Sequence, residues 1–525
     1  MKKNIYSNFS QHVIIKLLTN LDRDPMSPTY GSFDRNYWNY KIRDFSSAIL
    51  QQGALTLSLI YSNNFFGNIY YNKKIVKDYA IAAIRFWTKI QYKNGGFPEY
   101  WAQEKSIPAT AFSLYSICTA AKIIDYSSAT LNKVIRKAVN FLLKNVEEGA
   151  LNQEMAATCA VYAAGDFLKD NKIKKQSIIK FNKLLTKQKA EGWFPEYNGL
   201  DIGYLSVNLE FMVKFYQLSK NKKALDAAKK IVEITSYFIH PDGSLGGEYC
   251  TRNTEYFLPY GFEYMKKYTT LASSILNKLF DNINRPYLNY GIDSRYILHY
   301  VSPSIIQSDI EYKPDTNKEK LPCEKIFEKY FEEAMIYIKS TKKYYFICSL
   351  AKAGTLKVID KKTNYITTDC SYRIKHKNKL YTCEWPNNNT FNVKKGKVKV
   401  ISKFIKKKYV KQTPIKQTAL KILSAISSKF VISFAKKVII YDKNKFIEGF
   451  KINRYITLNE NTIIIEDEIL NALNKHIEIF HIPQLSMRHT ASSKFFQRNS
   501  IFNQINYKNF KTNKNFKNKT FINFK

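Results

Sequence analysis

Gly95-Gly96-Phe97-Pro98-Glu99-Tyr100 is repeated 97 residues later as Gly192-Trp193-Phe194-Pro195-Glu196-Tyr197. A weaker echo, Gly246-Gly247-Glu248-Tyr249, follows 52 residues after the second copy, and Gly149-Ala150-Leu151-Asn152 forms a similar turn midway between the first two. A unit of about fifty residues is long enough for two helices and two connections. The repeat therefore predicts a series of helical hairpins joined by glycine-bearing turns.

The stretches between these turns have the apolar spacing of amphipathic helices. Apolar residues recur at i, i+3, i+4 and i+7 in Ala48–Tyr61, Val76–Ile90, Ala109–Ile124, Met155–Leu168, Tyr204–Leu218 and Ala224–Phe238. A hairpin of this size cannot bury both of its faces alone, so it packs against its neighbours. We expect five or six hairpins to close into an α/α toroid over residues 1–310, with an open solenoid as the alternative.

The sequence changes character in a charged, Pro-bearing linker at 311–335. Beyond it, short β-branched and aromatic runs alternate with turn signals, as in Phe430–Tyr441 and Thr462–Glu468. These runs predict an antiparallel β-sandwich at 336–487, and hence an α+β multidomain chain. Residues 488–525, rich in Lys, Asn and Phe, are expected to be a low-complexity basic tail.

The chain is strongly basic, with 83 Lys and Arg against 43 Asp and Glu, a formal net charge of +40. Such an excess suits a polyanionic partner: nucleic acid, anionic lipid or an acidic polysaccharide. Its Lys-, Asn- and Ile-rich composition, typical of AT-rich genomes, is an alternative origin of the charge. The basic residues are scattered and no nucleic-acid motif accompanies them, so nucleic acid is not an expected partner.

The sequence favours a cytoplasmic location. Polar residues from Ser7 to Lys16 interrupt any signal-peptide core, and no run approaches the roughly 18 apolar residues of a membrane span. The seven cysteines include no close Cys-x-x-Cys pair, so we expect neither a disulfide framework nor a zinc site, and no cofactor.

Several stretches resemble the heparinase II/III-like proteins, in particular relatives encoded with bacterial surface-polysaccharide genes. The resemblance rests on the opening segments Asp22–Pro25 and Thr29–Trp38, the turns Gly192–Tyr204 and His240–Asn253, and the strand pattern Arg454–Ile469. It implies a carbon–oxygen lyase that cleaves an acidic polysaccharide or oligosaccharide next to a uronic acid by β-elimination.

Elimination requires removal of the C5 proton, which is acidic enough only when the adjacent carboxylate is neutralised. A base and an acid must also reach the substrate. In helical-toroid lyases an Asn, a Tyr and a His commonly share these roles, which implies Asn152, Tyr204 and His481 here, with Arg252 pairing with the carboxylate. Each also has a structural alternative: Asn152 as a helix N-cap, Tyr204 and His481 as packed side chains of a helix and a strand, and Arg252 as a turn residue.

A second group of residues is expected to bind the sugar. They lie in the N-terminal opening and in the repeated turns: Tyr30, Arg35, Trp38, Tyr100, Trp101, Tyr197, His240, Glu248, Tyr249 and Asn253. An arm that closes the toroid, or turns that hold the hairpins together, would explain the same residues. His476 and His481 invite a metal site, but no third ligand of suitable spacing accompanies them.

Other functions fit the same fold. A uronyl C5-epimerase would form the same carbanion and reprotonate its opposite face, and a glycoside hydrolase would need two well-placed carboxylates. A non-catalytic glycan-binding or assembly protein in surface-polysaccharide biosynthesis would keep the fold without the chemistry. That last reading is favoured if Asn152, Tyr204 and Arg252 do not converge.

Overall fold

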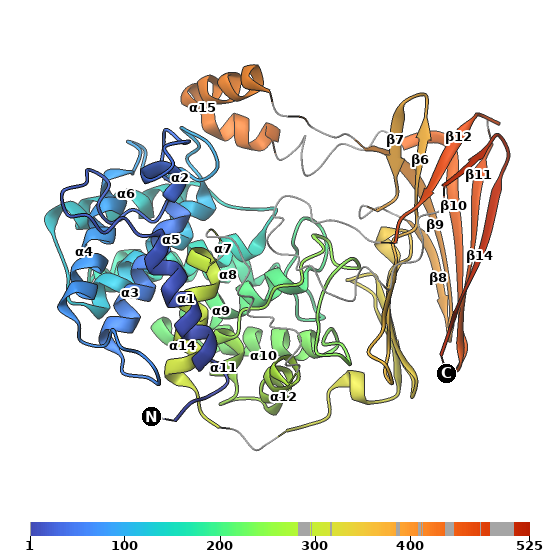
Figure 1. Cartoon of the computed structure of the whole chain (residues 1–525), viewed down its shortest axis with the longest axis horizontal. Coiled ribbons are helices and arrows are strands. Elements are labelled where there is room, and N and C mark those ends of the chain that lie inside the picture. Colours follow the sequence, from blue (N-terminus) through green and yellow to red (C-terminus); the bar gives the residue numbers. More distant parts are fainter. Residues whose placement is uncertain are drawn as a thin grey trace.

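The structure is a computed structural model of the chain. It describes residues 2–281, 295, 297–314, 318–384, 389–407, 411, 413–435, 446–472, 474–483 and 509–524. Helices fill most of the described residues up to Glu311, and strands dominate from Phe327 onward (Figure 1). The expected α+β class, an α/α toroid followed by an antiparallel β-sandwich, is confirmed. Residues 488–508 of the expected tail lie outside the described residues.

The inner wall of the toroid is a ring of helices that closes on itself. These helices are α3 (Gly53–Ser62), α5 (Ile107–Ile123), α7 (Leu151–Phe167), α9 (Ile202–Ser219), α11 (Tyr260–Met265) and α14 (Ser302–Glu311). Each packs against the next, and α14 packs back against α3. Most of their side chains are buried, because the ring covers one side of each helix and an outer layer covers the other. This closure decides in favour of the toroid over an open solenoid.

The outer layer consists of amphipathic helices that alternate with the inner ones. They are α4 (Lys74–Lys89), α6 (Ala129–Lys144), α8 (Asn171–Leu185), α10 (Lys222–Ser236) and α12 (Thr270–Phe280). Their apolar stripes are buried and their lysines are mostly exposed, as in α6, where Leu131, Ile135 and Leu142 face inward. The long α1 (Ser7–Asn20) packs against α14, while α2 (Arg35–Trp38) is a single turn.

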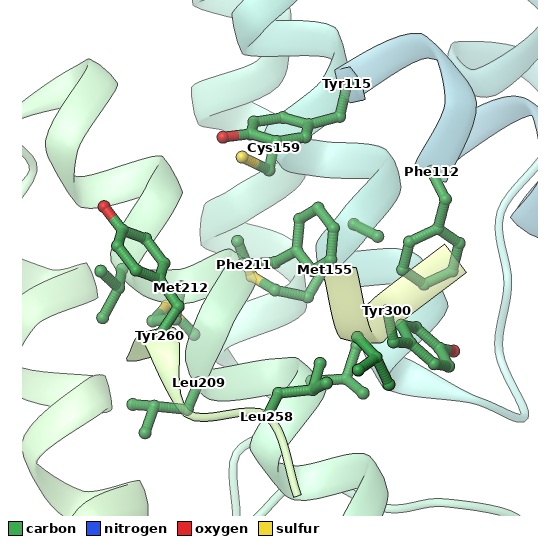
Figure 2. Packing of buried hydrophobic residues seen from close by; sticks show 14 of the residues in the cluster. Phe112, Tyr115, Met155, Cys159, Leu209, Phe211, Met212, Leu258, Tyr260 and Tyr300 are labelled. Atoms are coloured by element: carbon green, nitrogen blue, oxygen red, sulfur yellow. The ribbon is translucent and has the colours of Figure 1, made fainter. Parts of the chain in front are cut away.

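The centre of the ring is filled with side chains. Figure 2 shows Phe112 and Tyr115 from α5, Met155 and Cys159 from α7, and Phe211 from α9 meeting there. The Phe211 ring lies edge-on to those of Phe112 and Tyr115, with centroids 5.2 and 5.3 Å apart. Because α5 and α9 are not neighbours in the ring, this contact spans its interior. The toroid is therefore packed through its middle, and its rims are left for function.

The repeated turn is a backbone-to-backbone contact between hairpins. Gly95 and Gly192 have φ of +94° and +102°. A Cβ would lie 2.2 Å from the carbonyl oxygen of Lys137 at Gly95, and 2.7 Å from that of Lys230 at Gly192. Only glycine combines this φ with such a close approach, so the motif recurs wherever a turn passes against an outer helix.

A glutamine precedes each copy of the turn and holds it in place. Gln91 Nε2 donates to the carbonyl oxygens of Gly95 at 3.1 Å and Val134 at 2.9 Å. Gln188 makes the equivalent pair of bonds in the second copy, one of them to Gly192 at 2.9 Å. The two turns thus share their anchoring as well as their sequence.

The first sheet of the sandwich is a five-stranded antiparallel meander. Its strands follow the chain order β1 (Phe327–Phe331), β2 (Ile336–Ser340), β3 (Tyr344–Ser349), β4 (Thr355–Asp360) and β5 (Ile366–Asp369). Phe346 and Val358 on this sheet pack in one cluster with Val400 and Ile456 of the second sheet. The two sheets are therefore layered face to face.

Among the described residues, the second sheet has nine strands, in the order β13-β12-β6-β7-β9-β10-β11-β14, with β8 also paired to β9. Every pairing in it is antiparallel. The strands are β6 (Tyr372–His376), β7 (Lys379–Thr382), β8 (Thr390–Lys394), β9 (Lys397–Lys407), β10 (Phe446–Leu458), β11 (Thr462–Asn471), β12 (Ile477–His481), β13 (Asn509–Thr512) and β14 (Phe516–Asn523).

Two strands, β13 and β14, lie inside the segment expected to be a basic tail. β14 pairs with β11 along Thr462–Ile469, and its burial alternates along a sequence that mixes aromatic and β-branched residues with lysine and asparagine. This edge strand has a half-polar pattern and gains its order from the β11 ladder, which composition alone does not reveal. The division at 310, 335 and 487 stays a proposal.

Helix α15 (Pro414–Ala435) was not predicted. The strand expected over Phe430–Tyr441 is wrong up to Ala435, where the chain is helical, and 436–441 lie outside the described residues. The helix starts with Pro414, and the Thr413 hydroxyl accepts the Lys416 amide at 3.3 Å, so local start signals outweigh the β-branched composition. In Figure 1, α15 lies over the toroid although it belongs to the chain of the sandwich.

Candidate active site at the rim of the toroid

The inner helices α7 and α9 begin at the same rim. Asp201 caps α9, with its carboxylate accepting the amide of Tyr204 at 3.3 Å. The same carboxylate accepts the amide of Arg252 at 2.8 Å and the hydroxyl of Thr254. Asp201 therefore binds the turn at 248–254 to the start of α9. Two helix N-termini facing one region favour negative charge there.

Asn152 lies in the first turn of α7 and is held by Glu196 of the repeated turn. The Asn152 backbone amide and side-chain Nδ2 each donate to the Glu196 carboxylate at 2.7 Å, and Asn208 Nδ2 approaches it at 3.4 Å. Ala150 occupies the N-cap position of α7, so the plainer reading of Asn152 as an N-cap is wrong. Among the described residues, the buried Oδ1 atoms of Asn152 and Asn208 have no hydrogen-bond partner.

The Glu196 carboxyl has an unusual proton affinity. Burial raises the pKa of Glu196 to about 8, even though the two hydrogen bonds from Asn152 favour the ionised form. Near neutral pH this carboxyl therefore binds a proton readily. A protonated carboxyl donates through its O–H, and an Asn152 amide rotated by half a turn would accept that bond through Oδ1.

Arg252 lies between two tyrosine rings. Its guanidinium carbon is 4.3 Å from the ring centroid of Tyr197 and 5.8 Å from that of Tyr204. Burial raises the pKa of Tyr197, and the positive charge of Arg252 opposes that rise. Tyr197 has a φ of +54°, a strained value that the turn imposes on this non-glycine residue. Asn152, Tyr204 and Arg252 are thus joined through Glu196 and Tyr197.

The first copy of the repeated turn has a parallel arrangement. The guanidinium of Arg295 lies 4.4 Å from the ring centroid of Tyr100 and pairs with the buried Glu99 carboxylate. Tyr100 is also within electrostatic reach of Tyr204, in the first turn of α9. Its side chain is 48% exposed, in contrast to the buried Tyr204. The cluster is therefore open to solvent at Tyr100.

Sequence reasoning missed two groups in this part of the cluster, Arg295 and Glu104. Arg295 belongs to no repeated turn, and its one signal is a basic residue at the start of an apolar stretch. Glu104 is buried, and both burial and the nearby Glu99 raise its pKa. Lys352 of the sandwich was also missed, and it donates to Asn253 Oδ1 and to the carbonyls of Glu248 and Cys250.

Three predicted residues of the turn at 240–249 serve its structure. His240 is buried, with Nδ1 2.6 Å from the hydroxyl of Ser244 and Nε2 2.9 Å from that of Tyr249. The Glu248 carboxylate pairs with Lys357 of the sandwich at 3.3 Å. These contacts order the turn and join it to the second domain, and the sugar-binding role of His240, Glu248 and Tyr249 stays a prediction.

The N-terminal opening is held by local contacts. Trp38 Nε1 donates to the carbonyl of Asn20 at 3.0 Å, and Arg35 donates to Asn39 at 3.2 Å. Burial raises the pKa of Tyr30, with smaller effects from Tyr79 and other groups nearby. These contacts of the described residues are local, and the sugar-binding role of Tyr30, Arg35 and Trp38 stays a prediction.

His481 lies in the interior of the sandwich. Its Nε2 is 3.1 Å from Asp369, which also pairs with Arg454 at 2.9 Å, and its ring lies edge-on to Tyr372. These contacts come from the sandwich, and among the described residues none joins His481 to the toroid cluster. Its role as the base stays a prediction without support from this geometry. No group of three or more His, Cys, Asp or Glu in the described part of the chain is arranged to hold a metal ion.

Known structures share this fold. The chondroitin AC lyase of Streptomyces coelicolor A3, solved with chondroitin sulphate, is similar with a TM-score of 0.60 and 10% identity, over 91% of this chain and 67% of its own. A Paenibacillus xanthan lyase has a TM-score of 0.51 and 11% identity, over 90% of this chain and 46% of its own. Heparinase III has a TM-score of 0.47 and 10% identity, over 91% of this chain and 76% of its own.

No family model matches the sequence, and no curated protein matches it. The structural neighbours are polysaccharide lyases, and at 10–11% identity the similarity establishes a shared fold. The chain spans about two thirds of the chondroitin lyase and about half of the xanthan lyase. None of the described helices is long and apolar enough to cross a membrane.

Proposed function

We propose that this chain is a polysaccharide lyase of the heparinase II/III-like kind, which cleaves a uronic-acid-containing glycan by C5 proton abstraction and β-elimination. The observation that carries the proposal is the convergence of Asn152, Tyr204 and Arg252 on one rim, where α7 and α9 begin. A non-catalytic binding protein would be favoured if these three residues lay apart. The lyase fold of the structural neighbours supports the same reading.

In this mechanism Tyr204 transfers the proton. Its phenolate takes the proton from C5, the C5 electron pair forms a double bond to C4, and the C4–O bond breaks with the phenol returning the proton to the departing oxygen. Arg252 makes this feasible because its cation lies 5.8 Å from the Tyr204 ring and stabilises a phenolate. The same guanidinium pairs with the substrate carboxylate, whose neutralisation acidifies C5.

Asn152 assists at the carboxylate. With Glu196 protonated, the rotated Asn152 amide accepts the carboxyl O–H through Oδ1 and presents Nδ2 to the cluster as a donor. An amide donor at the N-terminus of α7 suits an anionic group. Tyr100 and Trp101, at the more exposed edge, would then stack on neighbouring sugar rings.

The test is absorbance near 230 nm, where an unsaturated uronate absorbs, with the purified protein and a panel of uronic-acid polysaccharides. We expect a rise in absorbance that Tyr204→Phe abolishes. Arg252→Lys should slow the reaction by about 10²-fold, because lysine keeps the charge but not the planar, stacked guanidinium. Ile179→Gln, on the exposed side of α8, is the matched control and should leave the rate unchanged.

Other outcomes would replace the proposal. No rise, together with exchange of the C5 proton into heavy water, would establish the uronyl C5-epimerase. Cleavage without unsaturated product would establish a glycoside hydrolase, and binding without either reaction a glycan-binding or assembly protein. The cytoplasmic location and the role in making a surface polysaccharide stay predictions from the sequence.

A further inference from the structure

Helix α15 contacts the toroid on one side and exposes large apolar side chains on the other. The side that touches the toroid makes polar contacts: Ser424 accepts Trp101 Nε1 at 2.8 Å and, through its carbonyl, the Lys105 ammonium at 3.0 Å. Val431, two turns further along the same side, is buried. Lys421 on the same helix pairs with Asp44 of the N-terminal arm at 2.8 Å. Polar contacts therefore fix the middle of the helix to the toroid rim.

The opposite side of α15 carries large apolar side chains. Ile415, Ile422 and Ile426 are 82%, 58% and 79% exposed. Their spacings of seven and four residues place them on one face, whereas Ser424 falls on the other because it is two residues from both Ile422 and Ile426. The three isoleucines, here termed the α15 stripe, extend over about 16 Å of helix. A globular protein rarely turns such a stripe to water unless something covers it.

The surroundings of the α15 stripe are basic. Lys416 lies beside the stripe and is exposed, as is Lys411 just before the helix, while Lys421 on the other side is paired with Asp44. On the toroid arm, the exposed Ile42 lies two residues from Asp44, the ion-pair partner of Lys421. Apolar groups bordered by lysines that can extend outward match the boundary between acyl chains and anionic headgroups.

We propose that α15 docks the protein on an anionic membrane surface, with the stripe buried in the outer part of the lipid layer. Charge complementarity favours this occupant, since a chain of net charge +40 is drawn to negative headgroups. A second copy of the chain would bring the lysines beside one stripe against those of the other. A polysaccharide would satisfy the lysines but leave the isoleucines in water. Docking would place the rim at Trp101 next to the membrane.

Vesicle co-sedimentation of the full chain tests the proposal. We expect binding to phosphatidylcholine vesicles that contain phosphatidylglycerol, weaker binding to phosphatidylcholine alone, and weakening by salt. The double variant Ile422→Gln/Ile426→Gln should bind at least about tenfold more weakly, because it removes two of the three large apolar groups of the stripe. Ile179→Gln, exposed to a similar degree on α8, should bind like the wild type.

Three results would overturn it. The wild type would fail to sediment with anionic vesicles, or the double variant would sediment as well as the wild type. Alternatively, sedimentation velocity would show self-association that the double variant loses, and the stripe would then be covered by a second copy. Thermal unfolding of each variant checks that the fold is intact, and because these residues lie outside the candidate active site, lyase activity and membrane binding are separate readouts.

Discussion

At the residue scale, the same motif glutamate has different partners in the two copies of the turn. Glu99 accepts the Ser106 hydroxyl and pairs with Arg295, so a cation balances its charge. Glu196 has two hydrogen bonds from Asn152 and is fully buried, which raises its pKa to about 8. The shared Phe-Pro-Glu-Tyr sequence thus places its glutamate in an ion pair in one copy and beside an asparagine amide in the other, because the partner of the glutamate comes from elsewhere in the fold.

The raised pKa of Glu196 makes stability depend on pH. Between its ordinary value of 4.5 and about 8, the folded chain keeps a proton that the unfolded chain releases, so this group's contribution to stability is lost as pH rises. The glutamine of the Glu196→Gln variant does not titrate. The free energy of unfolding of this variant should therefore fall less steeply with pH than that of the wild type, by up to about 1.4 kcal/mol per pH unit. Urea unfolding across this window measures the slope. The exposed Glu460→Gln should leave it unchanged, and equal slopes for wild type and Glu196→Gln would refute the assignment.

At the scale of elements, each repeated turn is anchored to the hairpins on both sides. The Pro98 carbonyl accepts the amide of Ala48 at 2.9 Å, and the Pro195 carbonyl accepts that of Leu151 at 3.4 Å. The glycine of the turn meanwhile lies against an outer helix, as Gly192 does against Lys230. A turn with so many fixed neighbours cannot shift to relieve a clash.

Gly192→Ala should destabilise the protein by about 2–3 kcal/mol, because the new Cβ meets the Lys230 carbonyl at 2.7 Å and the φ of +102° strains any L side chain. The thermal unfolding midpoint should fall accordingly. Ala190→Ser, two residues earlier and exposed, is the control and should be within about 0.5 kcal/mol of the wild type. An unchanged midpoint for Gly192→Ala would mean that the turn is freer to move than this packing implies.

At the scale of the whole molecule, buried lysines of the first sheet join the sandwich to the toroid. Lys357 Nζ lies 3.3 Å from the carboxylates of Glu248 and Glu255 and donates to the Gly246 carbonyl at 3.0 Å. Burial opposes its charge, but the two carboxylates outweigh burial and raise the pKa of Lys357. The same toroid turn continues to Arg252, so the interface also positions the candidate active site.

Lys357→Met should cost about 3–5 kcal/mol, because it leaves two buried carboxylates facing each other without a cation. The variant should unfold at lower urea concentration than the wild type. If the interface couples the two domains, probes in both domains should report the same loss of stability. The exposed Lys362→Met, on the same sheet's edge turn, removes one lysine without a buried partner and should unfold like the wild type. Coincident curves for all three proteins would show that the ion pairs contribute nothing to stability.

The sequence by itself determined the fold class, since the periodicity of the helices and the repeated glycine turns are local signals. The helix start signal at Pro414 was overlooked, so α15 was not predicted. The half-polar pattern of β14 is ambiguous, so the last strands were not predicted either. The β-branched run after Phe430 has strand propensity, but the helix that begins at Pro414 continues through its first residues.

Only the tertiary structure decided which candidate residues meet. Asn152, Tyr204 and Arg252 come from three hairpins, and Arg295 and Lys352 join them from segments that carry no motif. Ring closure between α14 and α3 brings such distant segments to one rim, and no local pattern encodes that contact. The pKa of a buried carboxyl likewise depends on desolvation and on partners far along the chain. Sequence patterns therefore identified the turns, and packing alone selected the residues that share a site.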